Sequence, residues 1–423
     1  MPDGPDISEI LAGHERHRLF APLDKAALAA EFARPQGAGL VAGRVVGLKA
    51  NIAVAGATWS AGLPHRADTR ASDDAHVTQR LRQEGAQLVP GLNMDAAALG
   101  GVTDNPFFGR TDNPRAPGFT AGGSSGGAAA AVASGLLDLA LGTDTMGSVR
   151  IPASYCGTFG LKPSFGLVGR SGIVPLAPSL DAVGPITASA ADLWPLLKTI
   201  AGPDNGDADN RLAPAQWDKD GPKTDLSDLK VGIPTAIQDV DCEPDVLQAL
   251  DRSEAVLARL GARVGTVPIR GWRPAKLRQR ALLVTECEGA VCHSEALAQT
   301  GTLPATVETL LAYGRDLTPG KMVAALSEMR TARAGLENAF AEVDVLLTPT
   351  TPHRAFRADR PAPANQADFT VLSNVAGTPA LAVPVPGDPL PCSVQVMGPA
   401  WSERQLIGIA MALEKAFGNE AVI

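Results

Sequence analysis

Two serines set in glycine-rich turns are the residues in this sequence best suited to chemistry. Ser124 lies in the run 122–127, which reads GGSSGG, and Ser148 lies in the run 142–152, which reads GTDTMGSVRIP. Glycine admits backbone conformations and close approaches that other residues resist. A serine hydroxyl in such a turn can lie beside inward-pointing backbone N–H groups, as acyl transfer requires of a nucleophile next to an oxyanion site. The two runs therefore predict acyl-transfer chemistry.

Lys49 is the candidate base. It lies between Leu48 and Ala50, in an apolar run over 44–56 that predicts a buried strand leading into a turn. An ordinary lysine, with a pKa of about 10.4, is almost wholly charged at neutral pH and is a poor base. Burial disfavours the charged form and leaves some neutral amine. A lone serine in a turn or a lone lysine near a strand end is usually structural, so the prediction rests on all three residues together.

The pattern around these residues predicts an α/β fold that positions them. Strands are expected over 87–92, 228–234, 262–267, 345–347 and 393–397, and helices over 72–84, 125–134, 246–260, 321–341 and 403–417. The stretch from 228 to 267 alternates strand, helix and strand, which is typical of a βαβ unit. The polar, turn-rich stretch 202–224 predicts an exposed connection rather than a clear domain boundary.

The composition favours an enzyme with a substantial core. Of the 423 residues, 45% are hydrophobic and 19% charged, and the formal charge of −8 argues against a nucleic-acid surface as the main partner. No run of 18 apolar residues predicts a membrane span, and residues 1–6 do not resemble a signal peptide. Five cysteines without framework spacing predict reduced thiols. Cys287, Cys292 and His293 have no second ligand pair for a structural zinc site. We expect a cytoplasmic enzyme with no metal.

Once Lys49, Ser124 and Ser148 are considered together, the chain resembles the amidase signature family of serine amidohydrolases. The similar segments are Val46 to about Pro185, Asp344 to Pro352, Ser373 to Pro384 and Gln395 to Glu414. Within the first segment, residues 93–95 read NMD and residues 160–163 read GLKP. The resemblance implies a Ser–cis-Ser–Lys triad, with Ser148 as the nucleophile, Ser124 as the bridging serine after a cis peptide bond, and Lys49 as the base.

The loop before the nucleophile is expected to bind the oxyanion and the substrate through Thr145, Met146 and Gly147. Met146 stands where the family commonly has glycine, and Ala50 follows Lys49 where the family usually has aspartate. If position 146 required a positive φ, methionine there would be strained. The alternative is that the position tolerates a side chain and that Met146 narrows the pocket. Ala50 bears on the orientation of Lys49, and so on the rate rather than the chemistry.

Charged residues near these motifs have two interpretations each. Asp144 and Arg150 are predicted to pair and brace the nucleophile loop, and the alternative is that Arg150 meets an anionic substrate. Glu286, Glu288 and His293 are predicted to lie on a solvated helix face, and the alternative is that they face the pocket.

The resemblance also implies the architecture and the activity. The fold would be a single α/β/α domain over residues 1–423, with a large mixed, mostly parallel sheet of about eleven strands flanked by helices. Its signature core would span about 44–190, a variable region about 200–340, and the C-terminal part of the same core 344–423. The activity would be hydrolysis of the C–N bond of a linear carboxamide, and this substrate would be a small molecule. The reaction would need no cofactor, and neither a nucleic acid nor a membrane would be a partner. Homodimers are frequent in the family, and the sequence leaves the oligomeric state and the substrate open.

Three alternatives remain. The chain is also similar to the glutaminase subunit of tRNA-dependent amidotransferases, which works with a partner that supplies tRNA binding. Residues 122–126 formally fit the G-x-S-x-G nucleophile elbow of α/β-hydrolases, with Ser124, Asp344 and His353 in that family's order. The segment 111–120, with two prolines and a glycine, argues against the strand that such an elbow needs. The third is a non-catalytic protein with the amidase fold, against which the intact triad argues.

Overall fold

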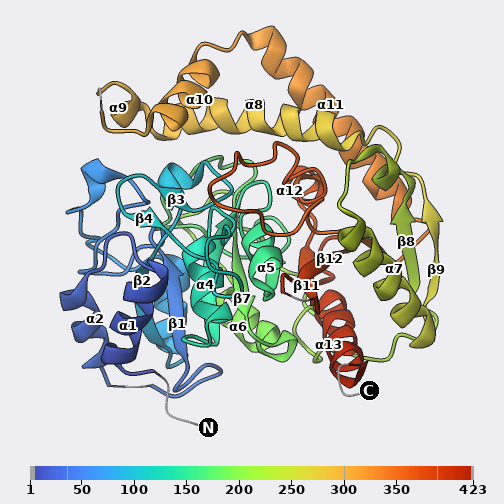
Figure 1. The fold of residues 1–423 in the computed structure, drawn as a ribbon, viewed down its shortest axis with the longest axis horizontal. Coiled ribbons are helices and arrows are strands. Elements are labelled where there is room, and N and C mark those ends of the chain that lie inside the picture. The colour runs from blue at the N-terminus through green and yellow to red at the C-terminus, as the bar shows by residue number, and fades with distance from the viewer. Residues whose placement is uncertain (1–4, 36, 300, 388, 421–423) are drawn as a thin grey trace.

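A ten-stranded mixed sheet forms the centre of the molecule (Figure 1). The structure is a computed structural model that describes residues 5–35, 37–299, 301–387 and 389–420. In spatial order the strands are β2 (Gln87–Leu92), β1 (Val45–Lys49), β5 (Leu139–Asp144), β7 (Ala182–Thr187), β6 (Phe159–Lys162), β11 (Ala380–Val385), β12 (Cys392–Met397), β10 (Val345–Pro349), β8 (Lys230–Pro234) and β9 (Arg263–Val267). The α/β fold with a mixed central sheet is thereby confirmed.

One detail of the expected sheet was wrong. Among the described residues the sheet has ten strands, close to the expected number of about eleven, but antiparallel pairings outnumber parallel ones, five to four. The parallel pairs lie at the two ends of the sheet, β2–β1–β5 and β10–β8–β9, and the strands between them pair antiparallel. Parallel neighbours need a long crossover, which α3 (His76–Gln83) supplies between β1 and β2 and α7 (Pro244–Arg259) between β8 and β9. In the centre, β11 and β12 are joined by a short segment that permits only the antiparallel arrangement.

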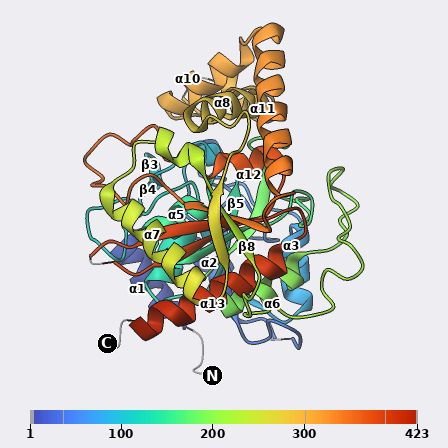
Figure 2. The ribbon, with the colours of Figure 1, turned by 90° about the vertical axis from the view of Figure 1, so that its right-hand side faces the viewer.

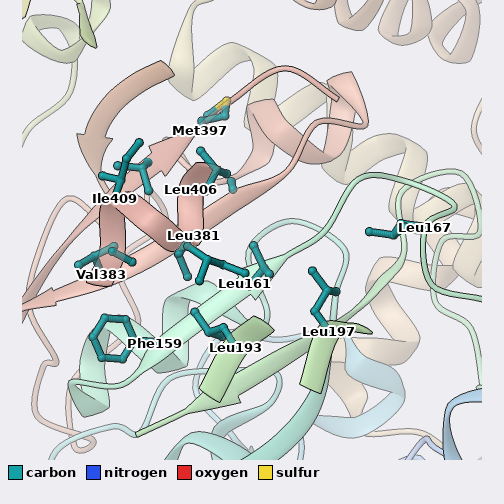
Figure 3. Close-up of a cluster of buried hydrophobic side chains, with 14 of the residues drawn as sticks. Phe159, Leu161, Leu167, Leu193, Leu197, Leu381, Val383, Met397, Leu406 and Ile409 are labelled. Atoms are coloured by element: carbon teal, nitrogen blue, oxygen red, sulfur yellow. The ribbon is translucent and has the colours of Figure 1, made fainter. Parts of the chain in front are cut away.

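Helices cover both faces of the sheet, which Figure 2 shows nearly edge-on. One face carries α4 (Gly126–Ala133), α5 (Arg150–Cys156) and α7 (Pro244–Arg259), and the other carries α3 (His76–Gln83), α6 (Leu193–Ile200) and α13 (Glu403–Glu420). On the second face, Leu161 and Leu381 of the sheet meet Leu193 of α6 and Leu406 of α13, all fully or almost fully buried (Figure 3). Each such side chain contributes about 1.5–3 kcal/mol through burial.

A further layer of helices lies beyond one edge of the sheet, at the top of Figures 1 and 2. It consists of α8 (Pro274–Cys292), α10 (Ala305–Arg315) and α11 (Pro319–Ala339), with α8 packed against the other two. The sequence predicted α11 with approximate bounds, but for α8 it predicted only a helix face around Glu286, Glu288 and His293. Buried residues occur around much of the circumference of α8, because it packs on other elements on more than one side, so the single apolar stripe of a surface helix is absent.

The remaining helices are short or peripheral: α1 (Ile7–His17), α2 (Lys25–Phe32), α9 (Ser294–Leu297) and α12 (Val371–Ala376). The short strands β3 (Asp104–Asn105) and β4 (Gly109–Arg110) form a separate hairpin. In the part of the chain that the structure describes, no helix is long and apolar enough to cross a membrane.

Candidate active site

The three residues predicted as a triad come from elements that meet at one edge of the sheet. Lys49 is the last residue of β1, and Ser148 lies in the loop that follows β5. Since β1 and β5 are parallel neighbours, their C-terminal ends lie side by side. Ser124 comes shortly before α4, which packs on both strands. The fold therefore brings together residues that are 99 positions apart in the chain.

Lys49 is fully buried and held by two hydroxyl groups. Its Nζ donates hydrogen bonds to Ser124 Oγ and to Thr143 Oγ1, both at 2.8 Å. Burial lowers the pKa of Lys49 to about 7, although the carboxyl groups of Asp95, Asp181 and Asp144 act in the opposite direction. At neutral pH a large share of the amine is therefore neutral and able to accept a proton.

The Ser124 turn is tied to the loop that carries Ser148. The peptide bond between Gly123 and Ser124 is cis, as the family resemblance implies. The next residue, Ser125, donates its N–H to the carbonyl of Ser148 at 3.2 Å and its hydroxyl to the carbonyl of Thr143 at 3.2 Å. Ser148 is 8% exposed, whereas Ser124 and Lys49 are completely buried. Ser148 is thus the outermost of the three and the one that a substrate can reach.

Glycine is required at position 147 rather than at 146. Gly147 has φ +133°, and a Cβ there would meet Ile151 Cδ1 at 2.8 Å. Met146 is not among the residues with positive φ, so methionine fits without backbone strain. The N–H of Gly147 donates to Asp144 Oδ1 at 2.8 Å, so this predicted oxyanion donor already has an acceptor. Thr145 and Met146 remain as predicted donors.

The side chain of Met146 contributes to the wall above the nucleophile loop. Its Sδ accepts a hydrogen bond from Thr285 Oγ1 of α8 at 3.6 Å, and its carbonyl accepts one from Thr370 Oγ1 at 2.6 Å. The side chain is partly buried against the main core. A methionine here links the nucleophile loop to the outer helical layer, which a glycine could not do.

Arg150 and Asp144 form a fully buried ion pair behind the nucleophile loop. Arg150 Nε donates to Asp144 Oδ2 and Nη2 to Oδ1, both at 2.9 Å. Burial opposes ionisation of Asp144, but Arg150 and the amide of Asn374 outweigh it and lower the pKa of the carboxyl to about 2. Asp144 also accepts the N–H groups of Gly147 and Val149 and so sets the shape of the loop.

The remaining N–H groups of Arg150 point into the protein. Nη1 donates to the Thr370 carbonyl, to Ser373 Oγ and to Gln395 Oε1, and Nη2 also donates to Asn374 Oδ1. A guanidinium has five N–H groups, and these contacts engage them on protein acceptors. Arg150 therefore braces the nucleophile loop, and the alternative that it binds an anionic substrate is excluded by its burial.

Replacing Arg150 with methionine is expected to lower the free energy of unfolding by about 3–5 kcal/mol, because Asp144 is left as an unpaired buried charge. Chemical denaturation of the two proteins measures the difference. The matched control is Arg34→Met, which removes an arginine that is 52% exposed and paired with Glu31. That change is expected to cost about 0–1 kcal/mol. Equal stability of Arg150→Met and the unmodified protein would contradict the bracing role.

Several residues that shape the site were not predicted. Thr143 holds Lys49, and Asn51 Nδ2 donates to Thr143 Oγ1 at 3.2 Å. Both lie next to the motifs that carry the triad, so their proximity in sequence to Lys49 and Ser148 was the available signal. Thr370 and Gln395 are 220 and 245 residues from Arg150, and no local pattern connects them to it.

The nucleophile-elbow alternative does not fit the structure. Asp344 Oδ2 accepts the backbone N–H of Lys230 at 2.8 Å, at the start of β10. His353 Nδ1 lies 3.0 Å from the hydroxyl of Tyr155. Ser124 instead contacts Lys49, and the segment before it is irregular rather than a strand.

The expected solvated face of α8 was also wrong for two of its three residues. Glu286 is 3% exposed and His293 is 6% exposed. Glu288 is nearer the surface, where its carboxylate accepts the N–H and hydroxyl of Ser179. The helical layer encloses this side of α8, and the solvated surface of these turns lies at Val291 instead.

A cavity of about 240 Å³ has Thr143, the residue whose hydroxyl holds Lys49, in its lining. Asn51 and Thr145 are further buried residues of this lining, and Asp209 is a half-exposed one. The cavity therefore lies between the surface and the residue that holds the candidate base.

The chain belongs to the amidase family. The family model described as Amidase matches residues 19–407, which is most of the sequence. The protein is accordingly an amidase signature hydrolase that acts on C–N bonds.

Curated relatives and solved structures agree with this assignment. One relative, a glutamyl-tRNA(Gln) amidotransferase subunit of Natronomonas pharaonis, is 35% identical over 415 residues, covering 90% of this chain and 98% of the relative. The crystal structure of the corresponding Thermotoga maritima subunit has a TM-score of 0.82 and 29% identity, covering 96% of this chain and 90% of that one. A 6-aminohexanoate cyclic dimer hydrolase has a TM-score of 0.86 at 24% identity, covering 97% and 92%, which shows the shared fold alone.

Proposed function

We propose that the protein hydrolyses the C–N bond of a linear carboxamide through an acyl-enzyme on Ser148. The observation that carries the proposal is the 2.8 Å hydrogen bond between Lys49 Nζ and Ser124 Oγ in a fully buried setting. With a pKa of about 7, neutral Lys49 takes the proton of Ser124 while Ser124 takes the proton of Ser148. Ser148 Oγ then attacks the carbonyl carbon.

The same groups complete the reaction. Backbone N–H groups of Thr145, Met146 and Ser148 hold the oxyanion, and each such donor is worth about 2.7–4 kcal/mol where it has been measured. The proton on Lys49 returns through Ser124 to the nitrogen of the substrate, and the C–N bond breaks to release ammonia or an amine. Water then attacks the ester on Ser148, which releases the carboxylate and restores the serine.

A second candidate is supported by the names of the relatives. Those at 33–35% identity over about nine-tenths of this chain are subunits of glutamyl-tRNA(Gln) amidotransferases. In that role the same triad would hydrolyse glutamine, and the ammonia would pass to a partner chain that supplies the tRNA site. The proposed chemistry on Ser148 is identical in the two candidates, and the substrate and partner differ.

We further propose that residues 1–423 act as one catalytic unit in the cytoplasm. Support for a single unit comes from the central sheet, which combines strands from 45–49 to 392–397. Support for a reducing compartment comes from the five cysteines, all of which are free thiols.

The test is ammonia release by the purified protein from aliphatic amides, aryl amides, amino-acid amides and glutamine, beside Ser148→Ala as control. Ammonia from one or more amides with the unmodified protein and none with the variant supports the proposal. Release from glutamine alone, increased by a co-purifying partner, favours the role within an amidotransferase. No release from any amide overturns the proposal of a free-standing amidase.

A further inference from the structure

Helix α8 lies over the loops that surround the candidate triad. Thr285 contacts Met146 of the nucleophile loop. One turn later, Gly289 packs so closely that an added Cβ would lie 3.1 Å from Leu176 Cδ1. Leu176 also lines the cavity to which Thr143 contributes. Ala290 packs with Ala96 and Ala97, in the turn that follows β2. One side of α8 therefore covers the loops that form the site.

Glu286 lies on this side of the helix, between the positions that contact the site. It is one residue from Thr285 and four from Ala290, so its side chain starts between Met146 and the turn at 96–98. It is 3% exposed. On the outside, Gly314 of α10 packs directly on the backbone of Glu286, with no room for a Cβ. The side chain of Glu286 is thus buried beneath the helical layer, on the side of α8 that carries Thr285 and Ala290.

One oxygen of the Glu286 carboxyl group lacks a partner among the described residues. Its Oε2 is buried and has no hydrogen-bond partner in the part of the chain that the structure describes. Burial raises the pKa of Glu286 to about 7, with no neighbouring charge contributing. A buried carboxylate without a partner is strongly destabilising, so proteins usually pair such groups. The missing partner is the feature that requires an explanation.

The other polar groups near the site are either paired or neutral. Asp181, in the cavity wall, accepts the hydroxyl of Thr145 and the N–H groups of Leu176 and Ala177. Arg170 is paired with Asp207 and Asp209. Asn51 Oδ1 and His293 Nε2 also lack partners within the described ranges of the chain. An amide is uncharged, however, and burial lowers the pKa of His293 to about 4, which keeps it neutral. Glu286 is therefore the acidic residue to which a ligand could supply the missing hydrogen-bond partner.

The geometry points to Glu286 as a specificity-determining residue that binds a primary ammonium group on the amide substrate. This inference rests on the proposed amidase function and narrows its substrate to aminoalkyl carboxamides, which include amino-acid amides. An ammonium group beside Glu286 would form a charge-assisted hydrogen bond that the protein itself does not supply. The apolar side chains of Met146 and Leu176 suit the aliphatic carbons between that ammonium and the scissile amide.

The first arm of the test compares two amides of equal size, 5-aminopentanamide and hexanamide, in which ammonium and methyl exchange places. The unmodified protein is expected to prefer the cationic amide in kcat/KM. Glu286→Gln keeps the shape of the side chain and is expected to lower this preference about 30-fold, as loss of a hydrogen bond to a charged group predicts. Glu286→Asp should retain part of it. Glu288→Gln, on the same helix, is the control and should keep the ratio of the unmodified protein.

The second arm does not depend on hydrolysis. Titration calorimetry with pentylammonium chloride and with pentanol is carried out on Ser148→Ala and on the double variant that also carries Glu286→Gln. The inference is supported if the affinity for pentylammonium is at least tenfold lower in the double variant than in Ser148→Ala, while the affinity for pentanol is the same in both. Absence of pentylammonium binding to Ser148→Ala, or equal binding to both, overturns it. Failure of the unmodified protein to hydrolyse any amide would overturn the proposed function, and the calorimetry would still decide the role of Glu286.

Discussion

Replacement of Ser148 by alanine is expected to lower kcat for amide hydrolysis on the order of 10⁴–10⁶-fold, as for nucleophilic serines in other hydrolases. The reason is that no acyl-enzyme can form without the Ser148 hydroxyl. Lys49 and Ser124 have no atom that replaces it, because both are fully buried and hydrogen-bonded to each other. Steady-state ammonia release measures the loss. A matched substitution, Ser134→Ala at the end of α4, removes a hydroxyl that bonds only its own helix and should keep the activity.

The identity of the nucleophile can be established separately with a fluorophosphonate. The attacking serine oxygen displaces fluoride and keeps the phosphonyl group, so the label marks the serine that reacts. Trypsin releases residues 116–150 as one peptide that contains both Ser124 and Ser148, so fragmentation within this peptide must locate the label. Label on Ser148 agrees with the assigned roles. Label on Ser124 would show that the order of the two serines is reversed.

Local sequence predicted the residues of the site better than it predicted their surroundings. Glycine-rich turns restrict the backbone strongly, so the runs around Ser124 and Ser148 have few structural interpretations. Strand β2 follows equally well from its own composition, and its bounds are those expected, 87–92. These features depend on neighbours in the chain, which can be read directly from the sequence.

Features that depend on distant neighbours could not be predicted in this way. The prediction of a mostly parallel sheet was wrong. It could not foresee antiparallel pairings such as that of β11 with β6, which joins segments more than 200 residues apart. The bounds of α8 were not predicted, because this helix is buried on several sides and lacks a single apolar stripe. Arg150 was expected to brace the loop through Asp144, but its contacts with Ser373 and Gln395 come from the far end of the chain.

The two departures from the family pattern have structural explanations that the sequence alone could not supply. With Ala50 the residue after Lys49 carries no carboxylate, yet Thr143 Oγ1 holds the amine at 2.8 Å. Asn51 in turn holds Thr143, so the orientation of Lys49 is fixed by a hydroxyl and an amide. Met146 occupies a position that does not need glycine, and the demanding backbone conformation lies one residue later, at Gly147. Both departures are therefore compatible with an intact triad.

Replacement of Lys49 by methionine is expected to remove the base and lower kcat about 10²–10⁴-fold, the usual contribution of a general base. In the unmodified protein the pKa of Lys49 is about 7, and only the neutral amine accepts a proton. We therefore expect kcat/KM to rise tenfold per pH unit up to about pH 7 and then to level off. A pH–rate profile measures this limb, and a flat profile across neutral pH would contradict the role of Lys49 as the base.

The same substitution should make the protein more stable at neutral pH. The pKa of Lys49 is lower in the folded protein than its ordinary value of 10.5, so between about pH 7 and 10.5 the unfolded chain binds more protons. The contribution of this lysine to stability therefore becomes less favourable as the pH falls through that range and is constant below it. Lys49→Met removes this dependence, so its gain in stability should be larger at neutral than at alkaline pH.

Lys162 provides the matched control for both effects. It is also buried, and burial lowers its pKa to about 7, but its Nζ donates to the carbonyl of Pro163 rather than to a serine. Lys162→Met should therefore reproduce the pH dependence of the stability change and retain the rise of kcat/KM up to about pH 7 that belongs to Lys49. If Lys162→Met abolished that rise and Lys49→Met did not, the assignment of Lys49 as the base would be wrong, and Lys162 would be the base instead. Comparison of the two variants separates the effect of burial, which both lysines share, from the effect of the contact with Ser124. Lys49 makes this contact, and through it the neutral amine can accept a proton.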